Sequence, residues 1–306
     1  MRLKAIKKSA DEENFDKMKA AYDACLNEDR IKELGAEPLV KVLDEIEKTF
    51  PITAASNSHA LKDIILLLSK NGISNLVSAG TGADDTDPDT VIVAVSAPYN
   101  FGLPSKERYE DTKLVEKYRS VAIEVLSSLL PDQDKGVFSK IIDLEKRLAA
   151  ASPDSEDRDD VTVSKCADDV SIDTDRSQKY YNPMSIDEAD AIAPEIGLKA
   201  VLYGLAPPDS KIERVIVMAP DYLKDLSLIL AATDKEVLQA YFAWKAVQSF
   251  SGYIDADAVK PYKRFRNVLA GKVRFPIIAG NTTNVHRIPI LLQSAGGPVL
   301  AMLMKV

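Results

Sequence analysis

Only two histidines occur in the 306-residue sequence, and they limit the metal chemistry that it could perform. A zinc hydrolase that carries its ligands on a helix needs histidines at i and i+4, with a glutamate between them to activate water. His59 and His286 stand apart, and neither has a second His, Cys or Glu at ligand spacing. We therefore expect no catalytic residue, no metal ligand and no bound cofactor in this chain. For each histidine we expect a surface or capping role.

A group of aspartates is the next candidate, because hard cations such as Ca²⁺ bind clustered carboxylates. Its members are Asp84, Asp85, Asp87 and Asp89. A calcium-binding helix–loop–helix motif that began at Asp85 would need glycine in place of Thr90 and glutamate in place of Ser96. The sequence therefore favours a solvated hairpin loop, and we interpret the acidic run 154–160 in the same way.

Two further patterns could carry chemistry, and each has a simpler structural interpretation. Gly80-Thr-Gly82 lacks the rest of a phosphate-binding loop and predicts a turn. No G-x-S-x-G motif is present to hold a nucleophilic serine. Basic and aromatic residues alternate near the end of the chain, and we expect them to form a solvated helix face: Lys260, Tyr262, Lys263, Arg264, Phe265 and Arg266.

Amino-acid composition and net charge make some classes of binding partner less favourable. Hydrophobic residues make up 46% and charged residues 28% of the chain, which is ordinary for a globular protein. The net charge of −8 disfavours binding to nucleic acid. We expect no signal segment in residues 1–11 and no membrane span, since the most apolar stretches, 64–68 and 288–306, are too short or interrupted by Gly and Pro. With only Cys25 and Cys166, neither a disulfide framework nor a cellular compartment can be predicted.

The elements that would position these residues are mostly helices. Apolar residues at intervals of three and four predict helices over 11–27, 38–50, 58–70, 110–130, 132–151, 185–193, 220–230, 237–254 and 257–270. Runs rich in β-branched residues predict a hairpin from strands 73–79 and 90–97, and a further strand over 212–218. The fold class is therefore mainly α, a large multi-helix domain with a small β-hairpin and short strands.

Several boundaries have a specific physical reason. Pro38 suits the first turn of a helix, and Asn71-Gly72 suits a helix end that adopts left-handed backbone. Ser185 and Glu188 have the spacing of a capping box. The Asp- and Ser-rich segment 152–175 predicts a flexible insertion, and 273–306 changes in composition and forms a divergent tail.

Six short segments together resemble one known family, in family order between about residues 14 and 271. They are Ala-Tyr-Asp-Ala-Cys25-Leu-Asn with Leu34-Gly-Ala-Glu-Pro38-Leu; Gly102-Leu-Pro-Ser105 with Tyr109-Glu; Ile142-Asp-Leu-Glu145 with Glu156-Asp-Arg-Asp; Tyr181-Asn-Pro-Met184; Val217-Met-Ala-Pro220-Asp-Tyr-Leu; and Trp244 with Phe265-Arg266. This set resembles the N-terminal helical region of the neprilysin and endothelin-converting enzyme family of zinc metalloendopeptidases.

The resemblance implies a large helical domain, residues 1–272 here, that caps a thermolysin-like zinc domain and restricts substrates to small peptides. Family members are typically anchored to membranes or secreted. The family's HExxH motif, its glutamate zinc ligand and its substrate-binding Asn-Ala pair have no counterpart in this sequence. We therefore expect the thermolysin-like catalytic domain to be lacking, the chain to be cut at both ends, and zinc to belong only to full-length relatives.

The chain also departs from the family pattern at its cysteines. The resemblance implies a disulfide between the position of Cys25 and a W-R-x-C segment, and no such segment follows Gly271. Asp111 and Arg119 stand near positions where a second family disulfide is expected. Two hypotheses remain: an inactive, substrate-restricting part of a peptidase, whose partners are peptides or a missing catalytic domain, or a stand-alone helical module that binds a peptide or protein.

Overall fold

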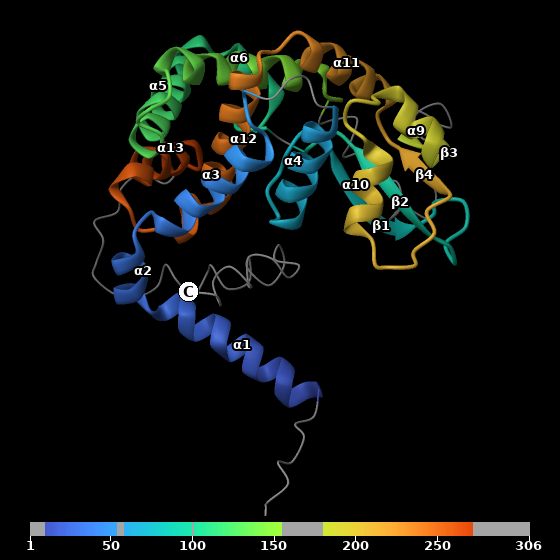
Figure 1. Ribbon diagram of the computed structural model, residues 1–306, viewed down its shortest axis with the longest axis horizontal. Helices are drawn as coiled ribbons and strands as arrows, with labels where there is room; N and C mark the ends of the chain where they lie inside the picture. The colour runs from blue at the N-terminus through green and yellow to red at the C-terminus, as the bar shows by residue number, and fades with distance from the viewer. Residues whose placement is uncertain (1–9, 54–57, 100, 155–179, 272–306) are drawn as a thin grey trace, which may run out of the picture.

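The structure is a computed structural model that describes residues 10–53, 58–99, 101–154 and 180–271 (Figure 1). Helices dominate these residues, and a small four-stranded sheet lies at the right-hand end of the view. The predicted fold class is confirmed. The insertion 152–175 and the tail 273–306 lie outside the described residues, except for Ser152 to Asp154.

The N-terminal helices follow the predicted boundaries closely, with one addition. They are α1 (Ala10–Leu26), α2 (Glu28–Leu34), α3 (Glu37–Thr49) and α4 (Ser58–Lys70), and α2 was not predicted. The side chain of Asn27 caps α2 by accepting from Arg30 N. Pro38 occupies the first turn of α3, and after α4 Gly72 has a φ of 66° that glycine adopts without strain.

The middle of the chain contains a 3₁₀ segment, η1 (Lys106–Glu110), and the helices α5 (Thr112–Leu129) and α6 (Lys135–Ala151). Asp111 and Asp134 cap the two helices, because each side chain accepts from backbone N–H groups of the first turn. Both helices place an apolar stripe in the core, as the sequence predicted.

Between residues 180 and 271 the structure describes the helices α9 (Ile186–Ile192), α10 (Leu198–Leu205), α11 (Pro220–Ala231), α12 (Lys235–Phe250) and α13 (Lys260–Leu269). Short 3₁₀ segments η3 (Ser251–Tyr253) and η4 (Asp257–Val259) connect the last two. The predicted capping box is confirmed, with both Ser185 and Glu188 bonds formed. Helix α10 was missed, and α12 ends at Phe250, so Ile254 is buried outside the helix.

The sheet has the strand order β1-β2-β4-β3. Its strands are β1 (Ser78–Ala83), β2 (Val91–Ser96), β3 (Pro183–Ser185) and β4 (Arg214–Val217). β1 is antiparallel to β2, β2 is parallel to β4, and β3 is antiparallel to β4. The prediction that the first strand covers 73–79 was wrong, because Ile73, Leu76 and Val77 are buried core residues ahead of the strand.

The core is one connected cluster that includes buried residues from α3 to α13. Helix α12 lies at its centre, since every residue from Val237 to Val247 is buried, including Gln239 and Lys245. It contacts α3 and α6, and Gln239 Nε2 donates to Phe50 O at 2.8 Å, next to the end of α3. Polar side chains on α12 therefore need partners within the protein.

Candidate functional site

Among the described residues, the densest cluster of polar side chains surrounds the buried carboxylate of Glu145 on α6. We call Tyr109, Tyr118, Glu145, Lys245 and Gln248 the Glu145 hub. Tyr109 Oη and Tyr118 Oη each donate to Glu145 Oε2 at 3.0 Å, and Gln248 Nε2 lies 3.3 Å from Glu145 Oε1. These bonds satisfy a carboxylate with no solvent exposure.

The hub also fixes the loop after β2. Tyr109 Oη accepts from Gly102 N at 3.1 Å and from Leu103 N at 3.2 Å. Lys245 Nζ donates to Phe101 O at 2.6 Å. A Cβ at Gly102 would overlap Tyr118 Oη and lie 2.5 Å from Glu145 Oε2, so only glycine allows this approach.

Aromatic rings from α12 and α13 complete the surroundings. Trp244 Nε1 donates to Tyr118 Oη at 2.8 Å, so the one tryptophan is both buried and hydrogen-bonded. The ring of Tyr118 stacks on that of Phe265 with centroids 5.3 Å apart, and Tyr262 meets Trp244 edge-on at 5.0 Å. Three segments of the family resemblance, around Gly102, Glu145 and Trp244, therefore meet at the hub.

Burial shifts the pKa values of the hub groups. It raises the pKa of Glu145, although the charge of Lys245 and the hydrogen bonds that Tyr109 and Tyr118 donate act in the opposite direction. Burial lowers the pKa of Lys245, opposed by the Glu145 charge, and it raises the pKa of Tyr109 and Tyr118 well above the usual tyrosine value.

The chemistry open to the hub is restricted by its packing. The backbone of Gly102 lies against the Tyr118 hydroxyl and the Glu145 carboxylate. Within residues 10–53, 58–99, 101–154 and 180–271, no group of three or more His, Cys, Asp or Glu could hold a metal ion. The geometry indicates a structural junction between a loop and three helices. In the sequence, Glu145 was noticed only as part of a family motif and not as the centre of a buried cluster.

A second buried carboxylate lies at the end of β1. We call Asp84, Thr86, Tyr181 and Arg214 the Asp84 corner. Tyr181 Oη donates to Asp84 Oδ1 at 2.7 Å, Thr86 N donates to the same oxygen at 3.0 Å, and Arg214 forms an ion pair with Oδ2. The hydrogen bond from Tyr181, followed by those from Thr86, lowers the pKa of Asp84.

The Asp84 corner corrects the prediction of a wholly solvated acidic loop. Asp84 is 1% exposed because it ties the hairpin to β4 and to the residue that precedes Asn182. Asn182 Nδ2 in turn donates to Val217 O at 3.0 Å. Asp85, Asp87 and Asp89 are exposed, as predicted, and in the acidic run Asp154 forms an ion pair with Lys106.

The histidines, the glycine pair and the cysteines singled out in the sequence lie in different parts of the chain. His59 lies in the first turn of α4, in a part of that helix whose side chains are not described, and His286 lies outside the described residues. The turn predicted for Gly80-Thr-Gly82 was wrong, because these residues pair with β2 and both glycines have open space where a Cβ would lie. Cys166 is not described, and Cys25 is half-buried on α1.

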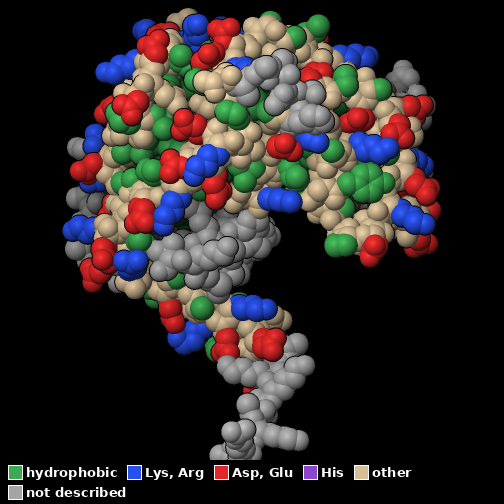
Figure 2. Space-filling model, viewed as in Figure 1, with side chains coloured by type: hydrophobic (Ala, Val, Ile, Leu, Met, Phe, Trp, Pro, Cys, Tyr) green, Lys and Arg blue, Asp and Glu red, His purple; other side chains and the backbone are tan. Residues whose placement is uncertain are grey.

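The basic segment near residue 260 forms α13, with its aromatic and charged residues on different faces. Tyr262 and Phe265 are buried, whereas Lys260, Arg264 and Arg266 are exposed. Lys260 pairs with Asp257 at 2.5 Å. Acidic and basic side chains are interspersed over the face seen in Figure 2, with no large patch of one sign.

Helix α1 differs from the other long helices because its apolar stripe is exposed. The exposed fractions are 65% for Phe15, 53% for Met18, 42% for Tyr22 and 41% for Leu26. The helix projects away from the main body (Figure 1). The sequence predicted the helix correctly but could not show that its large apolar side chains lie outside the core.

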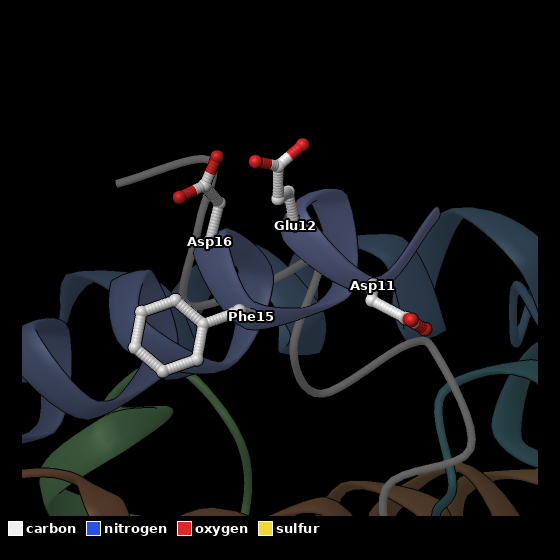
Figure 3. A pocket seen from close by; sticks show the side chains of 4 residues that line it. All are labelled: Asp11, Glu12, Phe15 and Asp16. Atoms are coloured by element: carbon white, nitrogen blue, oxygen red, sulfur yellow. The ribbon is translucent and has the colours of Figure 1, made fainter. Parts of the chain in front are cut away.

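A shallow depression on α1 is lined by Asp11, Glu12, Phe15 and Asp16. Figure 3 shows Glu12 and Asp16 projecting from one side of the helix, with Phe15 and Asp11 directed elsewhere. The carboxylates do not converge, so this depression adds no metal site. None of the described helices is long and apolar enough to cross a membrane.

Comparison with known proteins identifies relatives of the chain. The model of peptidase family M13, for its N-terminal region, matches residues 2–276. The endothelin-converting enzyme homolog of Locusta migratoria is 27% identical over 274 residues, which cover 83% of this chain and 35% of the relative. Mouse neprilysin is 24% identical over 280 residues, covering 83% of this chain and 36% of the relative. The chain thus spans about a third of the length of these relatives.

Solved structures support the same fold. The zinc metalloprotease Zmp1 of Mycobacterium tuberculosis matches in its open state with a TM-score of 0.70 and 16% identity, over 90% of this chain and 39% of that one. PepO of Lactobacillus rhamnosis matches with a TM-score of 0.64 and 17% identity, over 90% of this chain and 40% of that one. At these identities the likeness concerns the fold alone.

Proposed function

The chain belongs to peptidase family M13, and from this premise we propose that it is the non-catalytic, helical part of a zinc peptidase of that family. In this role it forms a wall that restricts substrates to small peptides, while another polypeptide segment supplies the zinc ligands and the catalytic glutamate. On its own the chain does not cleave peptides.

One observation carries the proposal: the family match extends over residues 2–276 of a sequence with two separated histidines and no HExxH motif. A zinc peptidase site needs clustered imidazole and carboxylate ligands. The Zmp1 structures are those of a zinc metalloprotease, whereas the described residues of this chain include no group of three or more His, Cys, Asp or Glu that could bind a metal ion. No catalytic step is therefore assigned to them.

The surface of α1 supports a role beside a second domain. An exposed row of large apolar side chains on one helix face is typical of an interaction surface. The row consists of Phe15, Met18, Tyr22 and Leu26, which recur at helical spacing. We propose that this row contacts the catalytic domain of such a peptidase.

A cleavage assay tests the proposal. The purified chain is incubated with zinc and a short quenched-fluorescence peptide, with and without phosphoramidon. We expect no turnover above that of zinc alone. Zinc-dependent, phosphoramidon-sensitive turnover by the purified chain would refute the proposed role.

A second candidate is a stand-alone helical module that binds a peptide or a protein, and the large connected core favours it. The two candidates differ in what the α1 row does in the isolated chain. A part of a larger enzyme exposes an interdomain surface and aggregates early on heating, whereas a module unfolds cooperatively without aggregation. Thermal melts at several concentrations, for the chain and for a variant with Phe15 and Met18 changed to serine, distinguish them.

A further inference from the structure

We propose that β1 is a docking edge for an extended, basic peptide segment, which adds to the sheet as a fifth strand beside Ser78–Ala83. The proposal does not depend on which of the two functions above is correct. It concerns a surface at the end of the sheet that includes neither histidine and no residue of the α1 row.

The hydrogen-bond pattern determines which backbone groups of β1 face outward. β1 is the terminal strand, and β2 is its neighbour in the sheet. Asp84 N donates to Thr90 O at 2.8 Å, so the residue that follows β1 bonds toward β2. In an antiparallel pair this direction alternates along the strand. The N–H and C=O groups of Ala79, Thr81 and Ala83 therefore point away from β2.

The outward groups have no partner within the residues that the structure describes. The backbone hydrogen bonds outside regular strand pairing include none from residues 78–83, and neither do the described side-chain bonds. All six residues of β1 are exposed. Unpaired edge groups of this kind are a template for an added strand, which gains affinity through main-chain hydrogen bonds.

The strand also lacks the features that usually protect an edge. Proteins protect edges with lysine, proline, bulges or very short strands. β1 is the sequence Ser-Ala-Gly-Thr-Gly-Ala, with a continuous six-residue register against β2. Gly80 and Gly82 have nothing within 4 Å of a Cβ position, so a partner can approach the backbone closely.

The side chains next to β1 indicate which residues a partner would carry. Thr81 lies opposite Val93 and Ala83 opposite Val91, and Val91 is 75% exposed. Since the residues of β1 are small, apolar side chains at alternate positions of a partner can reach across β1 toward these valines. An alternating, β-branched segment fits this surface.

Charge at the end of the edge selects a basic partner. Asp87 and Asp89 are exposed in the loop that follows Ala83, and Asp84 forms an ion pair with Arg214. A lysine or arginine beside this loop has favourable electrostatic interactions, and an acidic residue has unfavourable ones. A segment antiparallel to β1 would place its basic residues at its N-terminal end.

The Asp84 corner holds this edge in place before any partner binds. Tyr181 and Arg214 fix the carboxylate at the end of β1 through side chains from outside the hairpin. A rigid edge needs little ordering on association, which reduces the entropic cost of binding. The carboxylate of Asp84 thus has a positioning role in this proposal.

Fluorescence anisotropy tests the proposal with labelled peptides and the full chain, in the presence of EDTA so that no zinc-dependent cleavage intervenes. The probe has two lysines followed by alternating threonine and valine. Controls replace the lysines by glutamates, or methylate the peptide amides that would face β1. We expect saturable binding of the basic probe, about tenfold weaker binding of the acidic probe, and no binding of the methylated probe.

Variants of β1 localise the binding. Thr81→Pro removes an outward N–H without removing a bond to β2, and we expect about tenfold weaker binding. Thr81→Val keeps the N–H and should bind as the natural chain does. Urea unfolding checks that both variants fold, and hydrogen exchange should show slower exchange of the amides of Ala79, Thr81 and Ala83 when the basic probe is bound.

Three results would overturn the proposal. One is equal binding of the basic and methylated probes, because main-chain bonds would then play no part. Another is equal binding of the acidic and basic probes. The third is protection of the β1 amides that grows with protein concentration without peptide, which would assign the edge to a second copy of the chain. Absence of peptidase activity leaves the proposal unaffected, and failure of binding leaves the proposed function unaffected.

Discussion

Two carboxylates are buried in the part of the chain that the structure describes, and their pKa values shift in opposite directions. Glu145 lies among helices with no exposure, and desolvation, the largest cause, raises its pKa. Asp84 lies at the end of the sheet with 1% exposure, and the hydrogen bond from Tyr181, the largest cause, lowers its pKa. Both carboxylates accept several hydrogen bonds, so the direction of each shift depends on whether desolvation or the hydrogen bonds contribute more.

The comparison extends to the regions around the two groups. The Glu145 hub joins the loop at Gly102 to α5, α6 and α12 inside the core, so each partner depends on the others. The Asp84 corner secures the margin of a small sheet, beside an exposed edge strand. Substitutions in the hub should lower the stability of the whole domain, whereas substitutions in the corner should loosen the hairpin alone.

The largest expected effect is that of Glu145→Ala. Removing the carboxylate leaves the hydroxyls of Tyr109 and Tyr118 buried without their acceptor, and each buried polar group left unsatisfied in this way costs about 1–3 kcal/mol. Urea unfolding followed by circular dichroism measures the change. Glu145→Gln, which keeps acceptor and donor atoms at the site, should lose less. Equal stability of Glu145→Ala and the natural chain would contradict the hub's structural role.

Gly102→Ala should have the next largest effect. Its Cβ would overlap the hydroxyl of Tyr118, and overpacking of this kind costs about 1–3 kcal/mol. Gly252→Ala is the matched control, because a Cβ there meets nothing within 4 Å, and it should change stability by less than about 0.5 kcal/mol. Similar losses for the two variants would show that the loop at Gly102 can move away from the hub.

The pH dependence of stability should differ in sign between the two carboxylates. Asp84, with a lowered folded pKa, contributes stability that is present above its unfolded value of 3.8 and lost as the pH falls through the folded pKa. Glu145, with a raised folded pKa, contributes stability that is present below its unfolded value of 4.5 and lost as the pH rises through the folded pKa. The positive charge of Lys245 favours the ionised carboxylate and so opposes the rise in the pKa of Glu145.

Urea unfolding of the natural chain, Asp84→Asn and Glu145→Gln between about pH 3 and pH 6 measures these dependences, a range that spans the reference values of both carboxyl groups. The stability advantage of the natural chain over Asp84→Asn should shrink as the pH falls below 3.8. Relative to Glu145→Gln, the natural chain should become less stable as the pH rises above 4.5. The same sign for both differences would contradict the comparison.

The smallest expected effect is on α1, which extends the comparison to a helix outside the core. Phe15→Ser should change stability by less than about 0.5 kcal/mol, because its ring is already exposed. Phe138→Ala, in the core, should cost about 3–5 kcal/mol. Unfolding of both variants in urea measures the difference, and a large loss for Phe15→Ser would place α1 against the body of the protein in solution.

Sequence patterns predicted the helices well because periodicity and capping are local. Pro38 and the Ser185–Glu188 pair identified helix starts, and the structure confirms both. The start of β1 was wrong because buried β-branched residues ahead of a strand look like the strand itself. Ile73 and Val77 pack in the core, while the small residues that follow form the ladder.

The candidate sites were harder to predict because they depend on contacts distant in the chain. Tyr181 reaches Asp84 across 97 positions, and Trp244 reaches Tyr118 across 126. One sequence feature did point to the hub: Glu145 lies between Ile141 and Leu148 on the apolar stripe of its helix. A charged side chain on a buried face needs hydrogen-bond or charge partners within the protein. Which residues supply them is fixed only by the packing of α5, α6 and α12.

The bond between Gln239 and Phe50 has a consequence for synthesis on the ribosome. It joins positions 189 residues apart, and α12 fills the space between α3 and α6. A nascent chain therefore cannot close its core until residue 250 has left the exit tunnel. At about 5–20 residues per second, the early helices wait on the order of ten seconds or more with apolar faces exposed, a period in which chaperones would bind them.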